Sequence, residues 1–320
     1  MKKITVLLTV LAFTLSFANA TFAQEQKAES DTAVTAKKRP APIPRAHIVE
    51  DYLPILGKQA RANGVRPPKP FFISAIYYHM EIPQTITNAR GWGFHDAFMT
   101  EDQAIGVRME NAKIVTNSGG FRAGVNILPF MSIFGVYMHT EGYSQFTAVA
   151  DGNAAMPNGY MLNQKIDFKA DTGAVGVGFQ YGMRIGRVVP FAVLNANYAW
   201  TTTNMTDQII ETIIAGARVG LRVPLPKNMG ISAHIGTQYQ YLPMGNERSG
   251  QYTVELPAGT IIGQNDPISI TSKYRANAQN ASPWAMNAGI AFSATEHFMM
   301  LLEFGFLSRF TTMVAVQANF

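Results

Sequence analysis

The sequence predicts an all-β fold, a transmembrane antiparallel up-and-down β-barrel of ten strands, with twelve strands as the alternative. Charged residues make up only 15% of the chain, against roughly 25% in soluble proteins. The chain also carries 27 glycines and 20 phenylalanines. From Phe71 onward, segments of about ten residues alternate between apolar and polar positions, with turn residues between them. This combination is typical of a barrel whose outer face meets lipid.

The N-terminus has the pattern of an export signal. Two lysines follow the first methionine, Ile4 to Phe17 is apolar, and a small-residue cleavage site follows at Ala18–Ala20. Cleavage after Ala23 is also possible. With this later position, the expected signal peptide is residues 1–23. The apolar run is short for a membrane span. The chain has no cysteine, which excludes disulfides and thiolate metal sites.

Residues 24–70 are polar and interrupted by prolines, which is typical of a flexible periplasmic leader. The stretch IVEDYLPILGKQARANG (48–64) is expected to form one short helix. No later stretch is long and apolar enough for a transmembrane helix, so residues 71–320 form the expected barrel. No motif in it predicts a cofactor or a metal site.

Ten segments show the alternation expected of barrel strands. They are 71–81, 119–128, 131–141, 172–183, 188–201, 208–223, 230–242, 284–294, 297–308 and 311–320. Short links at one end of the predicted barrel alternate with generally longer links at the other, as in outer-membrane barrels. The stretch AIGVRMENAKIV (104–115) raises the alternative of twelve strands. The stretches GQYTVELP and ISITSKYRA suggest that long loops extend hairpins above the membrane.

With these features the chain resembles Gram-negative outer-membrane β-barrel proteins. Three stretches are similar to a group of uncharacterised outer-membrane proteins of similar length: LPFMSIFGVYMHTEG, GMRIGRVVPFAVLNANYAWT and HFMMLLEFGFLSRFTTMVAVQANF. The resemblance implies an outer-membrane location, with the lipid bilayer and lipopolysaccharide as partners. It also implies that the closing strand acts as a signal for the outer-membrane assembly machinery, through Val314, Val316, Ala318 and Phe320. It implies no catalytic residues.

The inward face of the predicted barrel collects polar side chains, and the expected lumen constriction is Arg122, Arg218, Arg222, His234 and Glu303. Buried charges need partners, and Glu303 is the mid-strand acid that faces these arginines. Two interpretations remain open. The residues form a salt-bridge plug in a narrow barrel, or they form an anion-selective constriction in a passive channel for small solutes.

An enzymatic alternative rests on two pairs at i, i+2 spacing near the outer rim, His79 with Glu81 and His139 with Glu141. Such a pair can serve as a general base in a hydrolase at the barrel lip. His95–Asp96 is a further candidate. The competing interpretation is that all of these are polar rim residues, because no nucleophile setting accompanies them. A secreted soluble β-rich binding protein is another alternative, and nothing predicts nucleic-acid binding. The sequence thus favours a non-enzymatic barrel, either a narrow channel or a structural, surface-loop protein.

Overall fold

The computed structural model describes residues 53–62, 67–92, 105–150, 160–243, 247–256 and 266–320. The expected signal peptide, most of the expected leader and the His95–Asp96 candidate lie outside these ranges. All described residues belong to one compact unit, Pro44–Phe320. Within the described ranges, no helix has the length and apolar character to cross a membrane.

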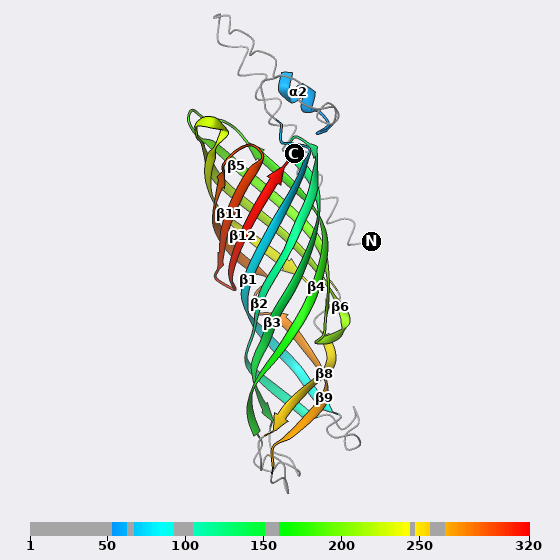
Figure 1. Cartoon of the computed structure of the whole chain (residues 1–320). Helices are drawn as coiled ribbons and strands as arrows, with labels where there is room; N and C mark the ends of the chain where they lie inside the picture. Colours follow the sequence, from blue (N-terminus) through cyan, green and yellow to red (C-terminus); the bar gives the residue numbers. More distant parts are fainter. Residues whose placement is uncertain (1–52, 63–66, 93–104, 151–159, 244–246, 257–265) are drawn as a thin grey trace, which may run out of the picture. The chain divides into compact units, whose positions relative to one another are not determined.

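The described part of the chain contains twelve strands (Figure 1). They are β1 (Phe71–Trp92), β2 (Ile105–Leu128), β3 (Met131–Ala150), β4 (Tyr160–Gly182), β5 (Val189–Thr203), β6 (Thr206–Pro224), β7 (Gly230–Tyr241), β8 (Glu247–Leu256), β9 (Ile268–Asn280), β10 (Trp284–Ser293), β11 (Phe298–Phe306) and β12 (Phe310–Asn319).

Ten of these strands close into an antiparallel barrel. The order runs β12-β11-β10-β7-β6-β5-β4-β3-β2-β1, and β12 pairs with β1 to complete the ring. Closure leaves no unpaired backbone edge in the ring, which is the condition for crossing lipid with strands. The predicted fold class and the ten predicted strand positions are confirmed.

The remaining two strands form a separate hairpin. Strands β8 and β9 pair with each other, and β9 pairs with the distal part of β1, from Gln84 to Trp92. The suggested hairpin above the barrel is therefore present. The described residues of the stretch 104–115, by contrast, add no strand of their own, because residues 105–115 are the beginning of β2, which pairs with β1 and β3.

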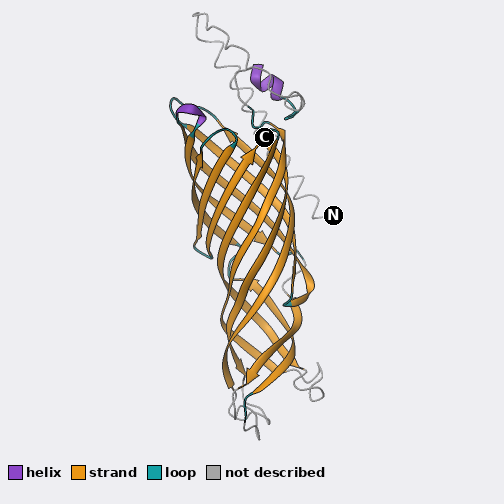
Figure 2. Cartoon of the chain, in the orientation of Figure 1, coloured by secondary structure: helices purple, strands orange, loops and turns teal. Residues whose placement is uncertain are grey.

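Strands β1 to β4 are about twice as long as the alternation predicts, and Figure 2 shows them continuing past the shorter strands of the barrel. Beyond the lipid boundary the exterior residues become polar, so the apolar pattern fades while backbone pairing continues. Lys113, for example, lies between Pro83 and Gln145 in the extension. The interior of the extension is apolar, with Phe146 and Ala148 buried against Ile86 and Ile166.

The exterior of the barrel is lined by large apolar side chains that are exposed. Among them are Ile73, Val175, Leu194, Val219, Ile235, Ile290, Phe304 and Val314. Towards the end of the barrel that carries the extension, exposed Tyr77, Tyr137, Tyr198, Trp200 and Trp284 form an aromatic girdle. An apolar band bounded by aromatic residues is the surface that a barrel presents to a bilayer.

The end of the barrel where β1 begins holds the described part of the expected leader. The helix α2 (Gly57–Ala62) is shorter than the predicted helix, of which residues 48–52 and 63–64 lie outside the described ranges. Ahead of it, the amide of Ile55 donates to the carbonyl of Ile127, at 2.7 Å. The side chain of Asn126 donates to the carbonyl of Lys69, at 2.6 Å. These bonds join the leader to the end of β2.

Candidate functional site

The carboxylate of Glu303, on β11, is the centre of a polar cluster inside the barrel. Arg218 on β6 donates to it through Nε and Nη2, at 2.6 and 2.9 Å. Nε2 of His234 on β7 lies 2.9 Å from one oxygen, and Nδ2 of Asn287 on β10 donates to the other at 2.9 Å. We call these four residues the Glu303 cluster. A carboxylate with this many partners is held in one place and is compensated in charge.

The Glu303 cluster is buried. The side chains of Glu303, His234 and Arg218 are 9%, 6% and 17% exposed, respectively. Small inward residues make room for it, since a Cβ on Gly236 would lie 2.5 Å from the side chain of Asn287. Three of the five predicted constriction residues, Arg218, His234 and Glu303, lie together in this cluster. Asn287 was missing from that prediction, although its place on the inward face of segment 284–294 is a usable signal.

The other two predicted constriction residues lie elsewhere. Arg122 faces inward from the β1–β3 wall, with its guanidinium carbon 3.8 Å from the ring centroid of Phe134 and 5.1 Å from that of Phe72. Phe72 and Phe134 are each 5% exposed. Arg222 is exposed near the β6–β7 turn, where its Nε lies 2.8 Å from a Cβ built on Gly230. Arg122 and these two rings therefore belong to strands that lie across the ring from those of the Glu303 cluster.

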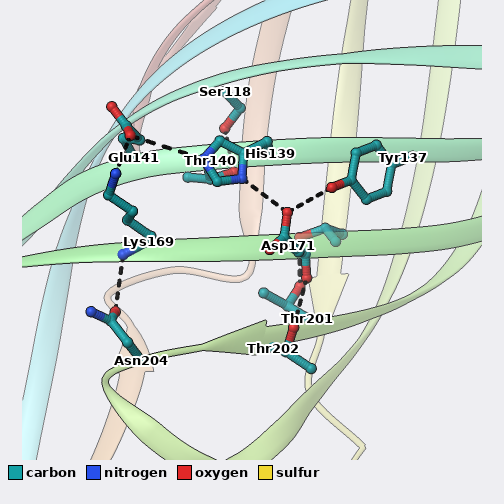
Figure 3. A network of polar contacts seen from close by, with 11 residues as sticks. Ser118, Tyr137, His139, Thr140, Glu141, Lys169, Asp171, Thr201, Thr202 and Asn204 are labelled. Carbon is teal, nitrogen blue, oxygen red and sulfur yellow. Dashed lines mark hydrogen bonds and ion pairs between the residues drawn. The ribbon is translucent and has the colours of Figure 1, made fainter.

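A second group of polar side chains lies on the outside of the barrel, at the aromatic girdle and just beyond it. Figure 3 shows its members on β3 and β4, Tyr137, His139, Glu141, Lys169 and Asp171, which we call the exterior belt. Asp171 accepts from the Tyr137 hydroxyl at 2.8 Å, and its carboxylate lies 2.9 Å from Nδ1 of His139. Lys169 Nζ lies 2.8 Å from the carboxylate of Glu141.

The ion pairs of the exterior belt shift the ionisation of its members. The hydrogen bond and charge of Lys169 lower the pKa of Glu141 below its ordinary value, and Glu141 raises the pKa of Lys169. The hydrogen bonds from His139 and Tyr137 lower the pKa of Asp171. All three charges are exposed to solvent, so these pairs contribute little to stability.

The structure also gives the geometry of the two predicted His–Glu pairs. Nε2 of His79 lies 3.8 Å from Glu81, and Nε2 of His139 lies 3.9 Å from Glu141. The closer partner of His139 is Asp171, which the sequence pattern did not single out because it lies on the neighbouring strand. Both ring nitrogens of His139 thus face carboxylates, which suits an ion-pair bridge better than a general base. Within the described ranges, no group of three or more His, Asp or Glu side chains has the arrangement of a metal site.

Beside the exterior belt, the β5–β6 turn is hydrogen-bonded to the backbone of β4. Asn204 accepts from the amide of Lys169 through its side chain, at 2.9 Å, and its own amide donates to the carbonyl of Lys169. A surface depression next to this contact is lined by Asn117, Glu141, Tyr143, Asp167 and Lys169, among others. The depression faces outward and lies at the level of the belt.

The closed barrel, its apolar exterior and its aromatic girdle define an outer-membrane β-barrel protein of the Gram-negative type. No protein-family profile and no curated protein sequence matches the chain.

Solved structures with some similarity include the β-domain of the Bordetella autotransporter BrkA, at 10% identity and a TM-score of 0.38, covering 78% of this chain and 99% of that one. The outer-membrane protein OprG from Pseudomonas aeruginosa is 11% identical with a TM-score of 0.34, covering 79% and 99%. An outer-membrane channel from Pseudomonas putida F1 is 11% identical with a TM-score of 0.32, covering 79% and 96%. The class rests on the barrel itself, because likeness at this level carries no argument about activity.

Proposed function

We propose that this chain is a non-enzymatic outer-membrane barrel whose lumen is closed by side chains and whose long strands carry a structured extension on the outer side of the membrane. The observation that supports closure is the Glu303 cluster. Its carboxylate is contacted by Arg218, His234 and Asn287, and it is buried on the wall formed by β6, β7, β10 and β11. Phe72, Arg122 and Phe134 fill the facing wall. Ten strands also lie near the barrel size whose interior is filled by side chains.

The test is ion conductance in a planar lipid bilayer. The wild-type barrel is expected to show no steady current in potassium chloride. Replacing Arg218 and Glu303 together by alanine removes the bonded pair without leaving a single unpaired charge, so this variant is expected to conduct. Gln317→Ala on β12 is a matched control, because it shortens an inward side chain outside the cluster. A steady wild-type current of single-channel size would overturn the closed-lumen proposal.

A narrow passive channel for small solutes is the second candidate. It is favoured by the excess of inward arginines over carboxylates, since Arg122 lies apart from Glu303. Such a channel would prefer anions. A wild-type current that reverses at the potential expected for chloride, in a salt gradient, would select this candidate over the closed barrel.

We further propose that the outer surface of the barrel contacts lipopolysaccharide at the level of the exterior belt. Lys169 and Lys165 lie there beyond the aromatic girdle, on the outward face of β4. Their ammonium groups suit the phosphates of a glycolipid headgroup. Co-purified lipopolysaccharide should fall when both lysines are replaced by glutamine, and should not change when Lys58 of α2 is replaced in the same way. Equal retention in both variants would reject the contact.

A further inference from the structure

A buried cation near the outer end of the barrel has no carboxylate partner among the described residues. Arg309 belongs to the link between β11 and β12, and only 5% of its surface is exposed. Its Nη1 donates to Oε1 of Gln240 at 2.7 Å. Gln240 lies on the inward face of β7 and accepts a second bond from Asn280, at 3.1 Å. The guanidinium of Arg309 is therefore inside the barrel.

The remaining edge of this guanidinium is unusual. Nε and Nη2 of Arg309 are buried, and neither has a hydrogen-bond partner in the part of the chain that the structure describes. These two nitrogens form the edge that arginine uses to grip a carboxylate or phosphate through parallel hydrogen bonds. Arg218 shows the same edge in use in the same barrel, since its Nε and Nη2 bond the two oxygens of Glu303.

The neighbours of Arg309 point to an anion. The ionisable side chain that interacts electrostatically with Arg309 is the phenol of Tyr78. Neither the amide of Gln240 nor a neutral phenol compensates a buried positive charge. A buried cation with two unmatched donors costs free energy unless an acceptor of opposite charge reaches it.

We propose that Arg309 is an anion-binding side chain of the barrel interior, which takes a small carboxylate or phosphate through its Nε–H and Nη2–H edge. The anion arrives from the outer end, above the Glu303 cluster, and displaces the side chains that cover the two nitrogens. Gln240 holds the other side of the guanidinium in place through Nη1. This site does not rest on the closed-lumen proposal, because it lies on the outer side of the cluster.

The direct test follows the Nε–H resonance of Arg309 by NMR in the full barrel, labelled with [15N]arginine and held in detergent micelles. Arg309→Lys identifies the resonance by its loss. Sodium acetate and sodium phosphate are titrated separately, with sodium chloride balancing the ionic strength. We expect a saturable shift, with a dissociation constant in roughly the millimolar range that a single ionic contact supports. Comparing the acetate titration with the phosphate titration shows whether the site prefers a carboxylate or a phosphate.

The Nε–H resonance of Arg218 is the internal control, because its edge already bonds Glu303. No shift at Arg309 with either anion would overturn the proposal, and so would an equal shift at Arg218, which would indicate a general effect of ions.

Thermal unfolding provides the second readout. The preferred anion should raise the unfolding temperature of the wild type and of Arg222→Gln, which removes the same charge from an exposed position. It should leave Arg309→Gln unchanged. An undiminished rise in Arg309→Gln would contradict the site. If that variant does not fold, the wild-type titration decides alone.

Discussion

Arg218 and Glu303 lie 85 positions apart in the chain and meet inside the barrel through two parallel hydrogen bonds, of 2.6 and 2.9 Å. The two residues belong to β6 and β11, with β7 and β10 between them in the ring. His234 and Asn287 reach the same carboxylate from those two intervening strands. One side chain thereby connects four neighbouring strands on the inside of the wall.

Replacing Glu303 by glutamine should destabilise the barrel strongly, because it leaves the buried guanidinium of Arg218 without a counter-charge. Breaking one side of a buried pair costs roughly 3–5 kcal/mol of unfolding free energy. Urea unfolding in detergent, followed by tryptophan fluorescence, measures the loss. Glu141→Gln is the matched control, since the same change on the exposed belt should have little effect. The double variant Arg218→Met/Glu303→Leu should recover part of the lost unfolding free energy. A double variant that is less stable than Glu303→Gln would contradict this account.

Gly176 is expected to tolerate no side chain. A Cβ there would lie 2.5 Å from the ring of Phe134 and 2.8 Å from the carbonyl of Ala196. Gly176→Ala should therefore lower the unfolding free energy by about 1–3 kcal/mol through overpacking. Gly135→Ala is the control, because the nearest atom to its Cβ is at 3.9 Å. Equal stability of the two alanine variants in the same urea experiment would show that the ring of Phe134 moves aside freely.

The exterior belt should lose a small contribution to stability on acidification. The folded-state pKa of Asp171 lies below its ordinary value because His139 and Tyr137 donate to the carboxylate. A carboxyl with a depressed pKa stabilises the folded state above its unfolded pKa, and this contribution disappears as the pH falls through the folded value. Tyr137→Phe and His139→Gln should each raise the pKa of Asp171, measured from its side-chain carbonyl resonance. A titration midpoint that stays the same in both variants would count against these bonds as the cause.

Phe320 lies where β12 and β1 pair to close the ring. It exchanges two backbone hydrogen bonds with Phe71, of 2.8 and 2.9 Å, and the two ring centroids are 6.1 Å apart. If Val314, Val316, Ala318 and Phe320 act as an assembly signal, Phe320→Ala should reduce insertion into the outer membrane while keeping both backbone bonds. Deleting Phe320 also removes those bonds, so it should lower the stability of the barrel that does form.

The measurement for this prediction is the heat-modifiable gel shift of the membrane fraction. Phe306→Ala, on the outward face of β11, is the control for losing a lipid-facing ring. Normal insertion of Phe320→Ala would argue that the ring is only a lipid contact.

Much of the barrel is readable from the sequence because a strand in lipid places apolar residues outward at every second position. That period identified the ten barrel strands, and it correctly put Arg218, His234 and Glu303 on the inward face. The same signal stops at the lipid boundary. Beyond Glu81 the exterior of β1 is as polar as a loop, so the long extension of β1–β4 could not be told from connecting segments.

The residue pattern alone is therefore enough to assign the class, a barrel with an apolar outside and a polar inside. Which polar residues meet depends on how the strands are arranged in three dimensions. Alternation assigns a side chain to a face but not to a height or a partner, because these depend on strand register and on the order of strands around the ring. That is why Glu303 pairs with Arg218 and not with Arg122, and why the carboxylate nearer to His139 is that of Asp171. It is also why Arg309, in a short link without any alternation, lies buried in the barrel interior.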